Sequence, residues 1–198
     1  MNLVKELKKI VQGEVKNDLR TLDEYSRDAS LFEIKPQVVV FPKNRQDIQS
    51  VVKFVARNKK EYPNLGITIR SGGTDMSGGA IGESIILDVT KHLNQVKKIT
   101  VSKNGGYAVV EPGVFYRDFE KETLKKNLIM PAFPASREIC TVGGMVANNA
   151  GGENTLSHGK VEDYIEELKI ILKDGKEYAF SPVPTSKLGE KLKLKGLE

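Results

Sequence analysis

The sequence predicts a fold of mixed helices and strands, of a length that suits one domain or two small subdomains, and its first part contains a small βαβ unit. A buried strand at 37–41, a helix at 46–60 and a second strand at 67–70 follow one another, and this order is typical of parallel βαβ units. Farther along, Asp-Gly at 174–175 separates two short apolar runs, which is a strong hairpin signal. The second part of the chain is therefore predicted to contain a further, mixed sheet.

The first 35 residues are predicted to form a helix and a lead-in to the sheet. Apolar residues recur at helical spacing and predict an amphipathic helix over 2–12. The polar stretch 17–30 that follows carries no clear periodicity and is assigned no helix or strand.

Residues 36–90 are predicted to be the first subdomain. The strand at 37–41 ends at Pro42, and Asn44 is a suitable N-cap for the helix at 46–60. A third strand is predicted at 84–89.

Residues 91–182 are predicted to be the second subdomain. Its predicted elements are a strand at 107–111, a helix at 115–126, and hairpin strands at 168–172 and 177–180. The segment 183–198 is rich in lysine and shows no further strand pattern, so it is interpreted as a basic tail.

Residues 70–79 read Arg-Ser-Gly-Gly-Thr-Asp-Met-Ser-Gly-Gly and directly follow a predicted strand. Glycine amides approach an anion closely, and successive amides in such a turn form an anion-binding nest. In an open α/β sheet a loop at the carboxyl end of a strand lies where ligands bind. The loop has neither the Walker A ending nor the Gly-x-Gly-x-x-Gly pattern. A phosphate-binding loop and a plain glycine-rich turn are the two interpretations that remain.

A second glycine-rich region, Thr-Val-Gly-Gly-Met-Val-Ala-Asn-Asn-Ala-Gly-Gly, occupies residues 141–152. Its small residues permit close approach of a flat ligand, and two asparagines supply amide donors and acceptors. A tightly packed helix start is the alternative. Two such regions in one chain favour a ligand between them.

Composition restricts the class of protein. The net charge is +5, from 31 basic and 26 acidic residues, and the chain has no tryptophan, so the dense basic stripe of a nucleic-acid-binding protein is missing. No run approaches the roughly 20 apolar residues of a membrane span, and the charged N-terminus does not read as a secretory signal. The single cysteine, Cys140, fits a reducing compartment. The expected location is the cytoplasm, with peripheral association at the inner face of the membrane as the alternative for a full-length protein.

The chain resembles the FAD-binding domain of the vanillyl-alcohol oxidase / p-cresol methylhydroxylase (PCMH) superfamily. Within it, the resemblance is to the FAD-linked 2-hydroxyacid dehydrogenases of the glycolate oxidase and D-lactate dehydrogenase group. It covers roughly residues 20–180, and the segments that carry it are 25–30 (Tyr-Ser-Arg-Asp-Ala-Ser), 36–42, 70–79, 111–113 (Glu-Pro-Gly), 141–152 and 159–164 (Gly-Lys-Val-Glu-Asp-Tyr).

The resemblance implies a PCMH-type fold that binds FAD between two α+β subdomains. It implies that Gly72, Gly73, Thr74 and Asp75 hold the pyrophosphate through their amides, with Ser77 beside it. Pro134, Ala135, Ser136 and Thr141 are expected along the flavin and ribityl chain, and Ile165, on the entering strand, near the adenine. The other residues expected at the cofactor are Arg70, Ser71, Met76, Gly78, Pro112, Gly143, Gly144, Ala147, Asn148 and Gly151.

The resemblance also bears on how FAD is held. Some members attach it through a histidine in the first glycine loop, and here that position is Thr74. Others use a cysteine two residues before the motif threonine, whereas Cys140 lies one residue before Thr141. Non-covalent FAD is therefore expected.

The implied reaction is oxidation of a 2-hydroxy acid with hydride transfer to FAD, and electrons pass on to a quinone or cytochrome-type acceptor. Family members bind substrate mainly through a C-terminal domain that has no counterpart here. The chain is therefore interpreted as an N-terminal fragment with an incomplete FAD domain and little or no activity of its own. A naturally short protein that a partner chain completes is the alternative. No catalytic residue or metal site is assigned. The alternatives are a UDP-N-acetylenolpyruvylglucosamine reductase-like flavoenzyme and a non-catalytic module that binds a nucleotide or a partner. His158 is either a packed loop residue or a residue near the cofactor.

Overall fold

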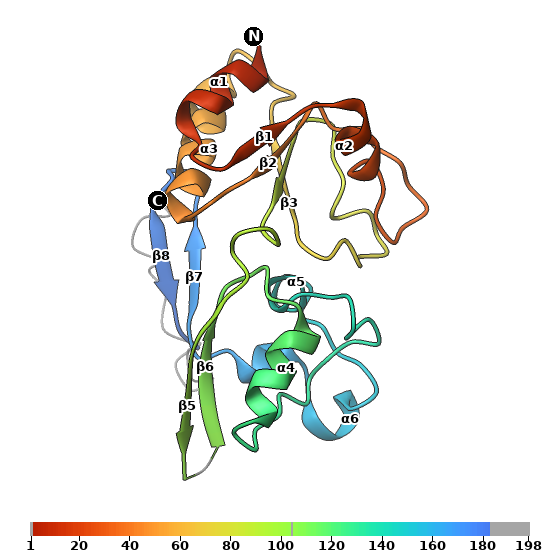
Figure 1. The fold of residues 1–198 in the computed structure, drawn as a ribbon, viewed down its shortest axis with the longest axis vertical. Helices are drawn as coiled ribbons and strands as arrows, with labels where there is room; N and C mark the ends of the chain where they lie inside the picture. Colours follow the sequence, from red (N-terminus) through yellow and green to blue (C-terminus); the bar gives the residue numbers. More distant parts are fainter. Residues whose placement is uncertain (1, 104, 183–198) are drawn as a thin grey trace, which may run out of the picture.

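The computed structural model describes residues 2–103 and 105–182, which form two lobes joined by a hairpin along one side (Figure 1). The predicted tail at 183–198 lies outside the described residues. The N-terminal lobe contains α1 (Leu3–Ile10), β1 (Glu14–Lys16), α2 (Leu19–Glu24), β2 (Val38–Phe41), α3 (Arg45–Asn58), β3 (Ile67–Arg70) and β4 (Ile85–Asp88). The C-terminal lobe contains β5 (Val96–Ser102), β6 (Gly105–Val110), α4 (Tyr116–Leu124), α5 (Val142–Ala147), α6 (Thr155–His158) and the 3-10 helix η1 (Val161–Tyr164), and the hairpin is β7 (Leu168–Ile171) with β8 (Glu177–Phe180).

The N-terminal lobe is organised by a four-stranded sheet with the order β1-β2-β4-β3. The strands β2 and β3 are both parallel to β4, and β1 is antiparallel to β2. The predicted parallel unit is present, but β4 lies between its two strands. Ile85, Ile86 and Leu87 of β4 are fully buried, and a strand that is apolar on both faces belongs at the centre of a covered sheet.

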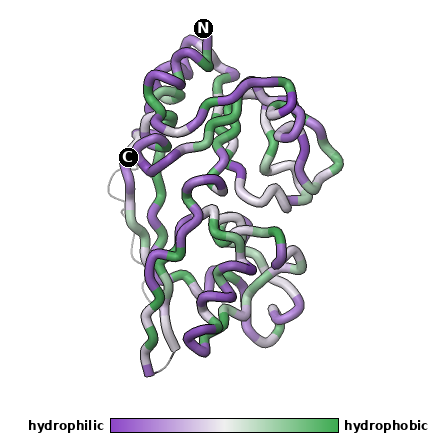
Figure 2. Tube along the Cα trace, in the orientation of Figure 1, coloured by the Kyte–Doolittle hydropathy of each residue, from purple (hydrophilic) through white to green (hydrophobic). Residues whose placement is uncertain are grey.

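Both faces of this sheet are covered, because successive side chains of a strand point to opposite sides. Val38 and Val40 pack with the residues of α1 and α3, whereas Val39 and Phe41 pack with Leu22 and Tyr25 on the other side. Hydrophobic stretches accordingly run through the central strands of this lobe (Figure 2).

Two elements of the N-terminal lobe lie in or beside residues 17–30, for which no helix or strand was predicted. The helix α2 begins after Asp18, whose side chain accepts a hydrogen bond from the amide of Thr21, and it buries no residue. The strand β1 has three residues, of which only Val15 is buried. Neither element carries an apolar periodicity long enough to be detected.

The strands after residue 95 form two separate two-stranded antiparallel ribbons, so the mixed sheet lies in the N-terminal lobe instead. The ribbon β5–β6 belongs to the C-terminal lobe, whose core includes Val96, Ala108 and Tyr116. The β7–β8 turn contacts α3, where Gln49 Nε2 donates a hydrogen bond of 2.9 Å to the carbonyl of Gly175. Each ribbon thus has its own packing partner.

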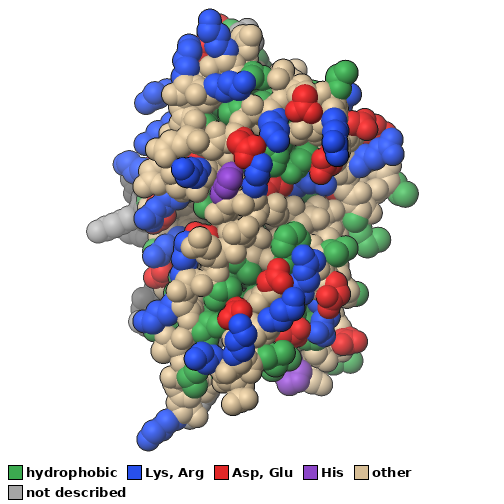
Figure 3. All heavy atoms as spheres, in the orientation of Figure 1, with side chains coloured by type: hydrophobic (Ala, Val, Ile, Leu, Met, Phe, Trp, Pro, Cys, Tyr) green, Lys and Arg blue, Asp and Glu red, His purple; other side chains and the backbone are tan. Residues whose placement is uncertain are grey.

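The surface carries charges of both signs. Figure 3 shows basic and acidic side chains interspersed over one face of the molecule, with hydrophobic side chains between them. Among the described residues, no helix is both long enough and apolar enough to cross a membrane.

Candidate functional site

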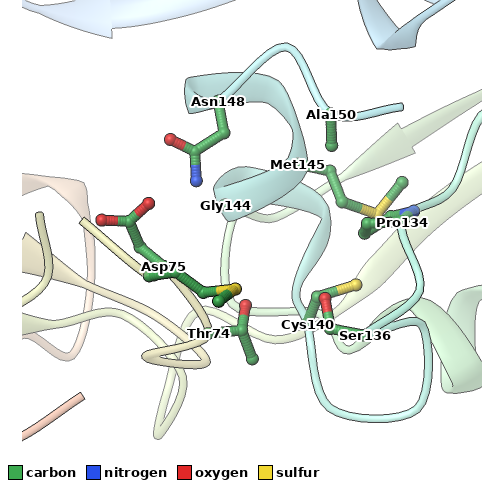
Figure 4. A pocket seen from close by; sticks show the side chains of 10 residues that line it. Thr74, Asp75, Pro134, Ser136, Cys140, Gly144, Met145, Asn148 and Ala150 are labelled. Atoms are coloured by element: carbon green, nitrogen blue, oxygen red, sulfur yellow. The ribbon is translucent and has the colours of Figure 1, made fainter. Parts of the chain in front are cut away.

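The two glycine-rich regions meet at a cavity between the lobes. The cavity has a volume of about 400 Å³, within the usual range for small-molecule sites. Figure 4 shows the side chains around it, which come from both regions and from the loop before α5. Its lining residues are Thr74, Asp75, Met76, Pro134, Ser136, Cys140, Gly144, Met145, Asn148 and Ala150.

Seven residues expected at the cofactor thus line one cavity: Thr74, Asp75, Met76, Pro134, Ser136, Gly144 and Asn148. Cys140, Met145 and Ala150 line it as well and were not predicted as site residues. Met145 and Ala150 belong to the second glycine-rich region, and their place within this motif was the sequence signal that could have identified them as site residues.

The first glycine loop, residues 70–79, is held from behind by the segment at 25–30. The amide of Ala29 donates a hydrogen bond of 3.0 Å to the carbonyl of Gly73. Gly73 has a φ of 64°, in the left-handed region that glycine adopts without strain. The loop is therefore anchored at its centre and follows directly after β3.

Arg70 lies behind the loop and is not a lining residue of the cavity. Its Nη1 donates a hydrogen bond of 2.6 Å to the carbonyl of Arg27, and its guanidinium lies 5.1 Å from the centre of the Tyr25 ring. The Tyr25 hydroxyl in turn donates to Asp88 at 2.9 Å. In this structure Arg70 links the loop to the 25–30 segment.

Asp75 accepts hydrogen bonds within its own loop. Its Oδ2 receives them from the hydroxyl of Ser77 at 2.6 Å, from the amide of Gly79 at 2.7 Å and from the amide of Ser77 at 3.2 Å. These bonds favour the ionised carboxylate, and the Ser77 hydroxyl above all lowers the pKa of Asp75 from its ordinary value. The carboxylate lines the cavity while its donors lie farther along the loop.

The second glycine-rich region begins as a capped helix. The Thr141 hydroxyl caps α5 by accepting a hydrogen bond of 3.2 Å from the amide of Gly144. A Cβ on Gly144 would lie 3.0 Å from the Ser71 hydroxyl oxygen, so this glycine permits close approach of the two regions. Gly143 packs on Pro112, whose carbonyl accepts its amide hydrogen at 2.9 Å.

Polar and sulfur-bearing side chains complete the wall of the cavity. Asn148 is exposed at the end of α5, and its amide is drawn on the same side of the cavity as Asp75 (Figure 4). Cys140 is 3% exposed, and burial raises the pKa of its thiol. Cys140 is thus a small buried side chain in the cavity wall.

Ile165 was expected on a strand entering the site, and this placement is wrong. It ends η1, and β7 begins only at Leu168. Its side chain packs against the core of the C-terminal lobe. His158 is an exposed residue whose carbonyl accepts a hydrogen bond from the Tyr164 hydroxyl.

Besides Arg70 and Ile165, the expected residues that do not line the cavity are Ser71, Gly72, Gly73, Ser77, Gly78, Pro112, Ala135, Thr141, Gly143, Ala147 and Gly151. Glycines at close approach, loop amides and a mixed apolar and polar wall suit a nucleotide cofactor with a flat ring and an anionic centre. The fold and the cavity thus define a domain that binds such a cofactor between two lobes.

Comparison with known proteins identifies the class. A family model described as "FAD binding domain" matches residues 36–181. The chain is 32% identical over 178 residues to a D-lactate dehydrogenase of Archaeoglobus fulgidus, covering 89% of this chain and 38% of that protein. It is 31% identical over 161 residues to D-2-hydroxyglutarate dehydrogenase of Escherichia coli (strain K12), covering 80% and 15%.

Solved structures agree on the fold. An alkyldihydroxyacetonephosphate synthase superposes with a TM-score of 0.75 at 20% identity, over 94% of this chain and 36% of that one. A chitooligosaccharide oxidase superposes with a TM-score of 0.72 at 17% identity, over 90% and 37%.

The chain belongs to the FAD-binding-domain family, and FAD is its cofactor. The predicted α+β, PCMH-type fold and the resemblance to the vanillyl-alcohol oxidase / PCMH superfamily are confirmed. The chain spans 15–38% of the length of the two dehydrogenases named above.

Proposed function

We propose that the chain is the FAD-binding portion of a flavin-dependent oxidoreductase that oxidises a 2-hydroxy acid of the D-lactate or glycolate type. The cavity at which the two glycine-rich regions meet carries the cofactor part of this proposal. The substrate part is supported by the relatives, which include D-lactate dehydrogenases and the glycolate oxidase subunit GlcD of Bacillus subtilis, 29% identical over 76% of this chain and 31% of that protein.

In this proposal the two subdomains, 36–90 and 91–182, hold FAD between them. The amides of residues 72–75 bind its pyrophosphate, and Ser77 lies beside them. Within the described part of the chain, these four amides donate no hydrogen bond to another residue, so they are available to an anion. Charge-assisted hydrogen bonds of this kind contribute roughly 1.5–3 kcal/mol each.

The flavin and ribityl parts are assigned to the wall formed before and along α5. Pro134 and Met145 supply apolar surface, and Ser136 and Asn148 supply hydrogen-bonding groups. Gly144 leaves room for close packing on the cofactor. Once bound, FAD supplies the hydride acceptor, while these residues bind it, orient it and exclude water.

FAD is proposed to be held without a covalent bond. Thr74, at the cavity, has no nucleophile comparable to an imidazole, and the buried Cys140 thiol is kept neutral by its raised pKa. In this proposal, substrate binding and acid–base catalysis depend mostly on groups outside these residues, and electrons pass to a quinone or cytochrome-type acceptor.

Two measurements test the proposal. Titration of the purified chain with FAD is expected to quench flavin fluorescence with a 1:1 end point, and acid precipitation is expected to release all flavin into the supernatant. Flavin that remains in the pellet contradicts the non-covalent assignment.

The second measurement uses the full-length protein under anaerobic conditions. D-lactate, glycolate and D-2-hydroxyglutarate are added separately, and one of them is expected to bleach the visible absorbance of the bound flavin. L-lactate is the matched control. Bound flavin that no 2-hydroxy acid reduces overturns the substrate class, and a chain that no flavin reconstitutes favours a non-catalytic module.

A further inference from the structure

We propose that Asp75 is a positioning residue of the cofactor site: its carboxylate binds the second half of the glycine loop and so leaves the amides of residues 72–75 free for an anion. The inference rests on the proposed use of this loop for the FAD pyrophosphate. It is independent of which substrate the enzyme oxidises.

The contacts of Asp75 divide the loop into two parts. Its Oδ2 accepts hydrogen bonds from the amides of Ser77 and Gly79, at 3.2 and 2.7 Å, and from the Ser77 hydroxyl at 2.6 Å. The amides of residues 72–75 have no acceptor among the described residues. One half of the loop is thus closed on an internal anion, and the other half is open.

The residue at position 79 permits this arrangement. A Cβ on Gly79 would lie 2.8 Å from Oδ2 of Asp75, which is closer than real Cβ contacts. Gly78, with a φ of 86°, provides the left-handed turn between the two amides that bind the carboxylate. The glycines at 78 and 79 therefore serve the carboxylate of Asp75, whereas those at 72 and 73 lie beside the free amides.

The open half is fixed from the other side. The Gly73 carbonyl accepts a hydrogen bond from the amide of Ala29, and the guanidinium of Arg70 lies behind Gly73, where a Cβ would be 2.7 Å from Nη2. A carbonyl that is held in this direction orients the amide that follows it, because the peptide group is planar. Asp75 and the 25–30 segment thus shape the open half from its two ends.

The alternative is that the carboxylate of Asp75 competes with the anionic ligand for the loop amides. A carboxylate beside an anion site repels the ligand, and a carboxylate that occupied the same amides as the ligand would have to leave them. The amides that bind Asp75 are those of residues 77 and 79, whereas the free amides are those of 72–75. Because the two sets differ, the carboxylate and the ligand do not need the same donors.

The test compares Asp75→Asn with Asp75→Ala in binding titrations with FAD and with ADP. An asparagine oxygen accepts the same hydrogen bonds without the charge, whereas alanine removes the acceptor. Asp174→Ala is the matched control, because Asp174 also accepts hydrogen bonds from an amide two residues farther along and from a hydroxyl, but lies in the β7–β8 turn and does not line the cavity. Thermal unfolding of each apo variant shows that the fold is retained.

The expected result is a Kd that rises about tenfold or more for both FAD and ADP in Asp75→Ala. The Kd of Asp75→Asn and of Asp174→Ala is expected to stay within about threefold of wild type, which is the scatter of a neutral substitution. Near-normal affinity in Asp75→Asn would show that Asp75 contributes through the hydrogen bonds it accepts and not through its charge.

Four outcomes overturn the inference. Wild-type affinity in Asp75→Ala removes any role in positioning. Tighter binding in both Asp75 variants identifies the carboxylate as a competitor, and equal weakening in both identifies its charge as the important property. A wild-type chain that binds neither FAD nor ADP overturns the cofactor site as well, whereas normal binding without reduction by a 2-hydroxy acid affects the proposed substrate alone.

Discussion

Gly72 of the N-terminal lobe lies directly against the carbonyl oxygen of Ile139 in the C-terminal lobe. A Cβ on Gly72 would overlap that oxygen and would lie 3.4 Å from the Cα of Cys140. The obstruction is main chain on both sides, so no side-chain rotation relieves it. The first glycine loop is thus in backbone contact with the segment that leads into α5, and this contact helps to set the width of the cavity.

Gly72→Ala is expected to weaken FAD binding and to destabilise the fold. Since the added methyl group overlaps backbone, the lobes must separate or the loop must shift, and overpacking of this kind costs about 1–3 kcal/mol. The midpoint of urea unfolding and the Kd for FAD are the two measurements.

Gly66→Ala is the matched control, because a Cβ on Gly66 has nothing within 4 Å and its φ is not left-handed. Its free energy of unfolding is expected to change by no more than about 0.5 kcal/mol. Equal effects of the two substitutions would show that the backbone contact at Gly72 does not control the site.

Asp47 is a buried acceptor that joins three segments of the N-terminal lobe. It is 1% exposed and accepts hydrogen bonds from the amides of Gln12, Gly13 and Lys43 at 2.8–2.9 Å. Asp47→Ala leaves these amides without a partner, and we expect a loss of at least about 3 kcal/mol in the free energy of unfolding. Chemical denaturation followed by circular dichroism measures it.

Asp118→Ala is the comparison for Asp47. Asp118 also lies in the first turn of a helix, but its side chain is 51% exposed and pairs only with neighbours on the surface. A change of about 0.5 kcal/mol or less is expected there. A small effect at Asp47 would mean that water replaces its carboxylate at the three amides.

The elements of the fold that were predicted are those whose signals are local. Asn44 caps α3, and its side chain accepts a hydrogen bond of 3.0 Å from the amide of Asp47. The strand β5 was missed because Lys97 and Lys98 hide its alternation, and its pairing with β6 includes a register shift between Val96 and Lys98. Similarly, β1 forms only because Val15 pairs with Val40, a partner distant in the sequence.

The site was predictable as a meeting of two glycine-rich regions, but not in its details. Composition alone indicated that both regions permit close approach. The inward direction of Met145 depends on the turn of α5, which the sequence does not specify residue by residue. The hydrogen bonds of Asp75 depend on the turn that its own loop makes up to Gly79, and the position of Arg70 behind the loop depends on a tertiary contact with Arg27.

The thiol of Cys140 reports on the cavity, because it is the only cysteine of the chain and lies in the cavity wall. Burial raises its pKa, so the folded protein favours the neutral thiol. The stability that this burial contributes is complete below the thiol pKa of the unfolded chain and is lost as the pH rises through the pKa of the folded state. We therefore expect the thiol to react slowly with a thiol-specific disulfide reagent near neutral pH, and the rate to increase steeply in alkali.

FAD is expected to slow the reaction of the Cys140 thiol further because it covers the cavity wall. Denatured protein supplies the reference rate, and Cys140→Ala supplies the blank. A native rate equal to the denatured rate at neutral pH, or one that FAD leaves unchanged, would contradict the placement of Cys140 at the cofactor site.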